Sequence, residues 1–135
     1  MERSMMSRAS VLAVSVLMLA LLPSANGFAS WQVDGNPIST ATGSQYLPQI
    51  ISDGAGGAIL TWADSRSGNY DIYAQRVDAS GAVLWAANGV ALCTAIGDQY
   101  VPTIVSDGAG GAIVTWEDYG LYVYAQRVNA SGAVQ

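Results

Sequence analysis

The sequence predicts an all-β fold made of two tandem four-stranded repeats. Residues 52–62, SDGAGGAILTW, return almost unchanged as residues 106–116, SDGAGGAIVTW. Around both copies, short runs of β-branched and aromatic residues alternate with glycine-containing turns, which is the pattern of short strands and hairpins. After Gly27, no stretch combines helical apolar periodicity with capping residues. We therefore expect strands throughout the repeats.

The segment 1–27 has the pattern of a secretory signal peptide. Arg3 and Arg8 precede an uncharged, mainly apolar run at residues 9–22, and small residues end at Gly27. Such a run is shorter than the roughly 20 residues of a membrane-spanning helix, and the small residues suit a signal peptidase. We expect residues 1–27 to be removed and the protein to be secreted, at the cell surface or periplasmic. The alternative is a short membrane anchor.

The two repeats, residues 31–84 and 85–135, make up nearly all of the chain after this leader. The second stops at Gln135, where the first continues with Leu84 and Trp85, so we expect a truncated second repeat and a partial propeller. Trp31 aligns with Trp85 and Trp62 with Trp116, and after a short deletion in the second copy Tyr73 aligns with Tyr124. A period of about 50 residues, with four strands and a tryptophan in the second strand, is typical of a β-propeller blade.

Each element of the first repeat follows from local sequence. The polar loops and turns are expected at residues 53–57, 65–69 and 78–81, where glycine allows positive φ. Residues 58–64 are apolar on both faces and should be buried between two layers. The first three predicted strands are residues 48–52, 58–64 and 70–77. A fourth strand begins at residues 82–85, and residues 90–94 either continue this strand or pair back against it.

The hairpin also predicts an ion pair in each repeat. If Asp64 lies opposite Tyr70, then Ala58 lies opposite Arg76, which brings the guanidinium close to the turn at Asp53. The same register in the second copy places Ala112 opposite Arg127, near Asp107. We expect the two arginines to clamp the glycine turns and to have a structural role.

The repeat string resembles that of a known group of proteins. Residues 64–77, D-x-R-x-G-x-x-D-I-Y-A-Q-R-V, preceded by S-D-G-x-G-G, resemble the tandem repeats of large secreted bacterial proteins of the sialidase-like β-propeller type. The resemblance covers both repeats and implies that each is a blade. However, Ser52 and Asp53 do not have the spacing to Trp62 of a sialidase Asp-box, and the second repeat lacks counterparts of Arg66 and Asp71. Sialidase chemistry is therefore not carried over.

One cluster of side chains is a candidate binding site. Aromatic residues beside carboxylates and an arginine can stack on a sugar and hydrogen-bond to it; the alternative is that the tryptophans belong to the core and the charges to solvated turns. Asp64 and Asp71 also offer the oxygen ligands that calcium prefers, although no cofactor is required. The candidates are Trp62, Asp64, Arg66 and Tyr70, with Trp116, Asp118 and Tyr119 in the second repeat.

Charge and composition exclude several functions. After Gly27 the chain has three arginines against nine acidic residues, with no lysine or histidine, so it lacks a basic footprint for nucleic acid or an anionic membrane. Its one glutamate there, Glu117, aligns with an alanine, so a catalytic acid–base pair is not indicated.

Two blades alone would leave apolar outer faces. We therefore expect further repeats of a longer chain, or copies of the chain itself, as partners. The function indicated is a non-catalytic secreted scaffold or an extracellular recognition surface, for example for glycan. The alternatives are a fragment of a sialidase-like glycoside hydrolase, or a two-blade lectin that forms a ring.

Overall fold

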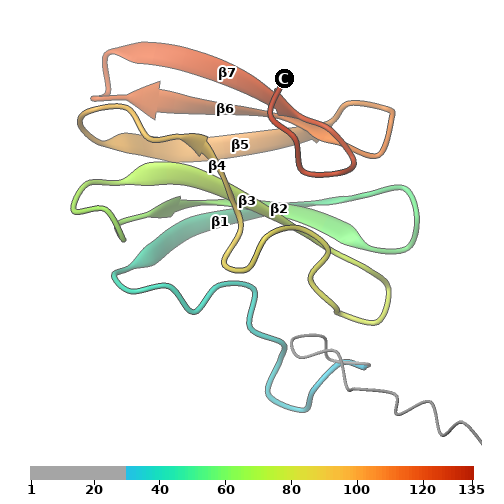
Figure 1. The fold of residues 1–135 in the computed structure, drawn as a ribbon. Helices are drawn as coiled ribbons and strands as arrows, with labels where there is room; N and C mark the ends of the chain where they lie inside the picture. The colour runs from blue at the N-terminus through green and yellow to red at the C-terminus, as the bar shows by residue number, and fades with distance from the viewer. Residues whose placement is uncertain (1–29) are drawn as a thin grey trace, which may run out of the picture.

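The computed structural model describes residues 30–135, which form two stacked antiparallel sheets and no helix (Figure 1). The signal peptide expected at residues 1–27 lies outside this range. Within the described range no helix is long and apolar enough to cross a membrane. The strands are β1 (Gln45–Ser52), β2 (Ala58–Asp64), β3 (Asp71–Val77), β4 (Val90–Cys93), β5 (Gln99–Ser106), β6 (Ala112–Asp118) and β7 (Tyr122–Val128).

The first sheet has the strand order β1-β2-β3-β4. Its fourth strand is β4, which pairs back on β3, while residues 82–85 contribute only an isolated bridge from Val83 to Val77. Gly89, at a φ of 89°, makes the turn that separates the two segments. The first sheet therefore extends to Cys93, beyond Leu84, where the sequence repeat ends.

The second sheet has only three strands, in the order β5-β6-β7, so the prediction of four strands in the second repeat is wrong. Beyond β7, within the part of the chain that the structure describes, the only strand pairing is an isolated bridge from Val128 to Val134. This bridge matches the one between Val77 and Val83. The outer edge of β7 consequently lacks the strand that β4 supplies to β3.

The predicted hairpin register is wrong by one residue. Asp64 pairs with Asp71, not with Tyr70, and Arg76 lies opposite Ile59, not Ala58. The same register holds in the second repeat, where Arg127 lies opposite Ile113. The slip occurs because Tyr70 belongs to the connecting loop, and its backbone N–H is bonded to Asp98 Oδ1 at 2.9 Å.

The hydrophobic core lies between the two sheets. Ile59, Ile72 and Ala74 of the first sheet cluster with Val114 and Trp116 of the second. Because β2 alternates across the sheet, Trp62 lies on the opposite, outer face, where it is nevertheless only 4% exposed. The prediction that β2 is buried on both faces is confirmed.

Candidate functional site

The predicted binding cluster of the first repeat is occupied by its own arginine. Asp64 has a fully buried side chain, and it accepts hydrogen bonds from Arg66 Nε at 2.9 Å and from Arg66 Nη2 at 2.6 Å. Trp62 Nε1 donates to the same carboxylate at 2.8 Å, and the backbone N–H of Arg66 donates at 3.0 Å. Both oxygens of the carboxylate are therefore occupied by donors from the protein itself.

The guanidinium is held on its other sides as well. Its central carbon lies 3.8 Å from the centroid of the Tyr73 ring, and Nη2 donates to Asn88 O at 2.8 Å. The Tyr73 ring stacks on Trp62 with 6.4 Å between centroids. We refer to Trp62, Asp64, Arg66 and Tyr73 as the Asp64 cluster; it combines an ion pair, a cation–π contact and an aromatic stack.

Electrostatics follow from this packing. Burial acts to raise the pKa of Asp64, but the hydrogen bonds from Arg66 and Trp62 outweigh burial and keep that pKa below its ordinary value. The same ion pair raises the pKa of Arg66, against the effect of desolvation. Both groups are therefore held in their charged forms, which suits an internal ion pair and does not suit proton transfer.

The second repeat does not rebuild this cluster. Trp116 still stacks on Tyr124, at 6.3 Å, but its buried Nε1 has no hydrogen-bond partner within the described part of the chain. Asp118 instead accepts from Gln99 Nε2 at 3.2 Å. The shorter loop of the second copy lacks the arginine that fixes the carboxylate beside the indole in the first repeat.

The two predicted tyrosines lie apart from the Asp64 cluster. Tyr70, in the loop between β2 and β3, packs on Tyr100 of β5, with 5.1 Å between ring centroids. Tyr119 has a φ of 52°, and its ring lies directly over Gly97. Of the seven candidate residues, the structure thus brings together Trp62, Asp64 and Arg66.

The expected arginine–aspartate pairs are present in both repeats. Arg76 Nη2 lies 2.8 Å from Asp53 Oδ2, and Arg127 Nη2 lies 2.9 Å from Asp107 Oδ2. The other oxygen of Asp53 accepts from the backbone N–H groups of Ala55 and Gly57, both at 2.8 Å. The bond from Ala55, followed by that from Arg76, lowers the pKa of Asp53.

Asp107 is held in the same way as Asp53. Its pKa is lowered first by the backbone N–H of Ala109, and also by Arg127 and by the backbone N–H of Gly111. In each repeat one carboxylate thus closes the glycine turn and anchors the arginine.

The structure gives the suggested calcium ligands other partners. Asp71 accepts from Ser67 Oγ and from Asn69 Nδ2, while Asp64 is bonded to Arg66. Among residues 30–135, no group of three or more acidic, cysteine or histidine side chains is arranged to hold a metal ion.

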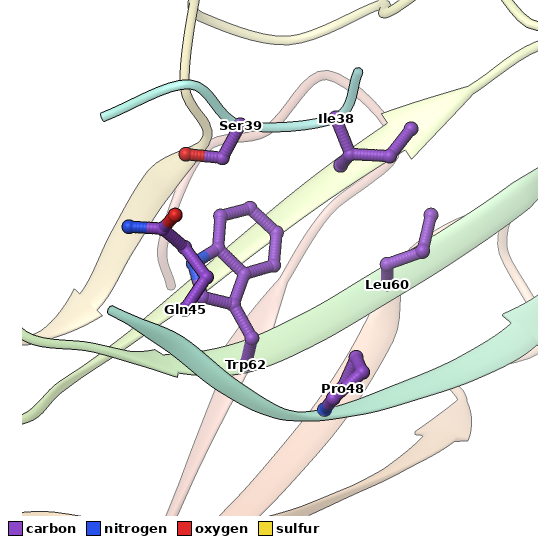
Figure 2. A pocket seen from close by; sticks show the side chains of 6 residues that line it. All are labelled: Ile38, Ser39, Gln45, Pro48, Leu60 and Trp62. Atoms are coloured by element: carbon purple, nitrogen blue, oxygen red, sulfur yellow. The ribbon is translucent and has the colours of Figure 1, made fainter. Parts of the chain in front are cut away.

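A small apolar pocket lies on the outer face of the first sheet. It has a volume of about 200 Å³, and Figure 2 shows Ile38 and Ser39 arching over the Trp62 ring. This is below the roughly 300–1,000 Å³ of ordinary small-molecule sites. Its lining comes from the segment before β1 and from β1 and β2: Ile38, Ser39, Gln45, Pro48, Leu60 and Trp62.

Two tryptophans that were not among the predicted site residues bond to turns far along the chain. Trp85 Nε1 donates to Ala130 O at 3.1 Å, linking the edge of the first sheet to a turn of the second. Trp31 Nε1 makes the matching bond to Ala79 O at 3.0 Å. The alignment of Trp31 with Trp85 in the repeat was the sequence signal that could have identified this role.

Comparison with protein-family models, with curated proteins and with solved structures finds no significant match to this chain.

Proposed function

We propose that this protein is a non-catalytic, secreted repeat module of the β-propeller type, whose sheets serve as blades of a structural scaffold. The observation that carries the proposal is the self-occupied Asp64 cluster. The aromatic, acidic and basic side chains best suited to a ligand are bonded to one another, and Asp64 is fully buried. Both oxygens of this buried carboxylate accept hydrogen bonds from the protein's own donors, so Asp64 is not presented to a ligand.

The other charged pairs support the same proposal. Asp53 and Asp107 each bond to two backbone N–H groups and to an arginine, so they hold the turns between strands. Glu117 lies exposed on β6. Asp71, the carboxylate opposite Asp64 in the hairpin, accepts hydrogen bonds from Ser67 and Asn69. Export through residues 1–27 belongs to the proposal as well.

The test pairs a binding assay with a stability assay. The purified protein should give only background signal on a glycan array and no hydrolysis of sialosides, while Arg66→Met should lower the stability to urea. Glycan binding by the wild type that disappears in Arg66→Met or Trp62→Phe would instead assign the cluster to recognition. A matched control is Arg127→Met, which changes an exposed arginine outside the cluster.

A further inference from the structure

The segment that precedes β1 is arranged like the segment that contains β4, although no sheet includes it. Gly35 and Gly89 have φ values of 90° and 89°, and each closes the same turn, to Gln32 O at 3.1 Å and to Ala86 O at 2.9 Å. Trp31 and Trp85 directly precede these turns. Their Nε1 groups donate to the carbonyls of Ala79 and Ala130, which occupy matching turns after β3 and β7. Residues 36–39 therefore correspond to β4.

Among the described residues 30–135, no strand pairs with the outer edge of β7 in the way that β4 pairs with β3. In the first sheet Gln75 holds the incoming chain, because its Oε1 accepts from Trp85 N at 3.0 Å and its Nε2 donates to Ala86 O at 2.8 Å. Gln126 is the counterpart of Gln75 within β7. No residue in the range 30–135 accepts a hydrogen bond from Gln126 Nε2, so this group has no partner like Ala86, which precedes β4 and corresponds to Gln32.

One face of the second sheet is exposed where the equivalent face of the first sheet is buried. Ile59 and Ile72 of the first sheet are fully buried against the second, whereas their counterparts Ile113 and Val123 are 38% and 76% exposed. We call this side of the second sheet its open face. Figure 1 shows it at the far side of the stack from the segment before β1.

The outer face of the first sheet, which carries the pocket of Figure 2, is the matching surface. The pocket residues Ile38, Leu60 and Trp62 correspond to Leu92, Val114 and Trp116, all of which lie in the core between the two sheets. Ile50, on the same outer face, is 64% exposed, while its counterpart Ile104 packs against that core. The second repeat thus shows how such a surface is covered.

We propose that copies of this chain associate head to tail, with residues 36–39 of one copy adding as a fourth strand to β7 of another. The outer face of the first copy then covers the open face of the second, in the geometry of the two sheets within one chain. Strand addition to an exposed edge supplies backbone hydrogen bonds, and face packing supplies apolar burial. The proposal rests on the scaffold function and names its partner as a second copy.

The experiment uses two single variants and their mixture. Val123→Lys places a charge on the open face, and Ile50→Lys places one on the outer face; both positions are exposed in the single chain, so folding should be retained. Burying an unpaired charge should weaken association about a hundredfold or more. Ile96→Lys is the control, because Ile96 is 94% exposed in the loop between the sheets.

In sedimentation velocity, the wild type and Ile96→Lys should gain mass as concentration rises, and each lysine variant alone should remain a monomer. An equimolar mixture of Val123→Lys and Ile50→Lys should form a heterodimer, since each retains the face that the other has lost. A wild type that stays monomeric, variants that still associate alone, or a mixture that does not pair would each overturn the proposal. If the wild type is monomeric and binds no glycan, the association proposal is wrong and the proposed scaffold function is unaffected. If the chains associate and also bind glycan, the scaffold function is wrong and the association proposal is unaffected.

Discussion

Replacing Arg66 with methionine should destabilise the protein by about 3 kcal/mol at neutral pH, because breaking a buried ion pair by removing one partner costs about 3–5 kcal/mol. The substitution keeps much of the aliphatic stem but leaves the fully buried Asp64 carboxylate without its counter-ion. The lower end applies because Trp62 Nε1 and the backbone N–H at position 66 still donate to Asp64, and the Arg66 side chain is 20% exposed.

Urea unfolding followed by tryptophan fluorescence measures this loss, with the free energy of unfolding extrapolated to water. The double variant Asp64→Asn/Arg66→Met should recover part of the loss, because no charge is then left buried. Lower pH should also narrow the gap between Arg66→Met and the wild type. Without Arg66, burial raises the pKa of Asp64, so the variant takes up a proton that the wild type does not.

An Arg66→Met variant whose free energy of unfolding at pH 7 lies within about 1 kcal/mol of the wild-type value would contradict a buried ion pair, since a solvated surface pair contributes no more than that. A gap that does not change with pH would show that Asp64 is not the group left unpaired.

Three further predictions test the turns and their charges. Arg76→Ala should lower the melting temperature more than Arg127→Ala, because the Arg76 side chain is 16% exposed and that of Arg127 is 49%; equal shifts in calorimetry would contradict this. Gly89→Ala should destabilise the protein more than Gly35→Ala. Both glycines have positive φ, but only the methyl group added at position 89 would meet Trp62, at 2.7 Å. Chemical denaturation of both variants measures the difference in the free energy of unfolding. Between about pH 5 and neutral pH stability should be constant, and it should fall as pH drops through the folded-state pKa values of four aspartates. Each folded-state pKa lies below its unfolded value, so folding releases protons, and a flat acid profile in thermal melts would argue against these pairs. The four aspartates are Asp53, Asp64, Asp78 and Asp107.

The internal repeat made much of the fold predictable, because aligned positions of the two copies occupy equivalent places. β2 and β6 begin and end as predicted from the recurring residues 52–62, and the pair between Arg76 and Asp53 recurs between Arg127 and Asp107. These features depend on the residues of each turn and on the alternation of side chains between the two faces of a strand. Both can be recognised from a short stretch of sequence.

The hairpin register and the site were harder to predict. The register depends on where the loop after Asp64 ends. Tyr70 belongs to this loop because its backbone N–H donates to Asp98, a residue far along the chain. Tyr70 and Arg66 are close in the chain, which predicts that they share a site. The Arg66 guanidinium instead packs on the ring of Tyr73, which pairs with Trp62 on the neighbouring strand. Cross-strand neighbours of this kind are visible only once the register is known.

The two repeats differ most at positions that are covered by a neighbouring segment in one repeat and exposed in the other. Ala63 is fully buried between the sheets, whereas its counterpart Glu117 lies exposed on the open face. In the first repeat Arg66 fills the space beside Trp62, whereas the second repeat has no such arginine and exposes half of Tyr124. A charged side chain at the position of Ala63 costs desolvation when a second sheet covers it. Head-to-tail association should therefore be weaker than the packing of the two sheets within one chain, and chains should separate before their sheets do.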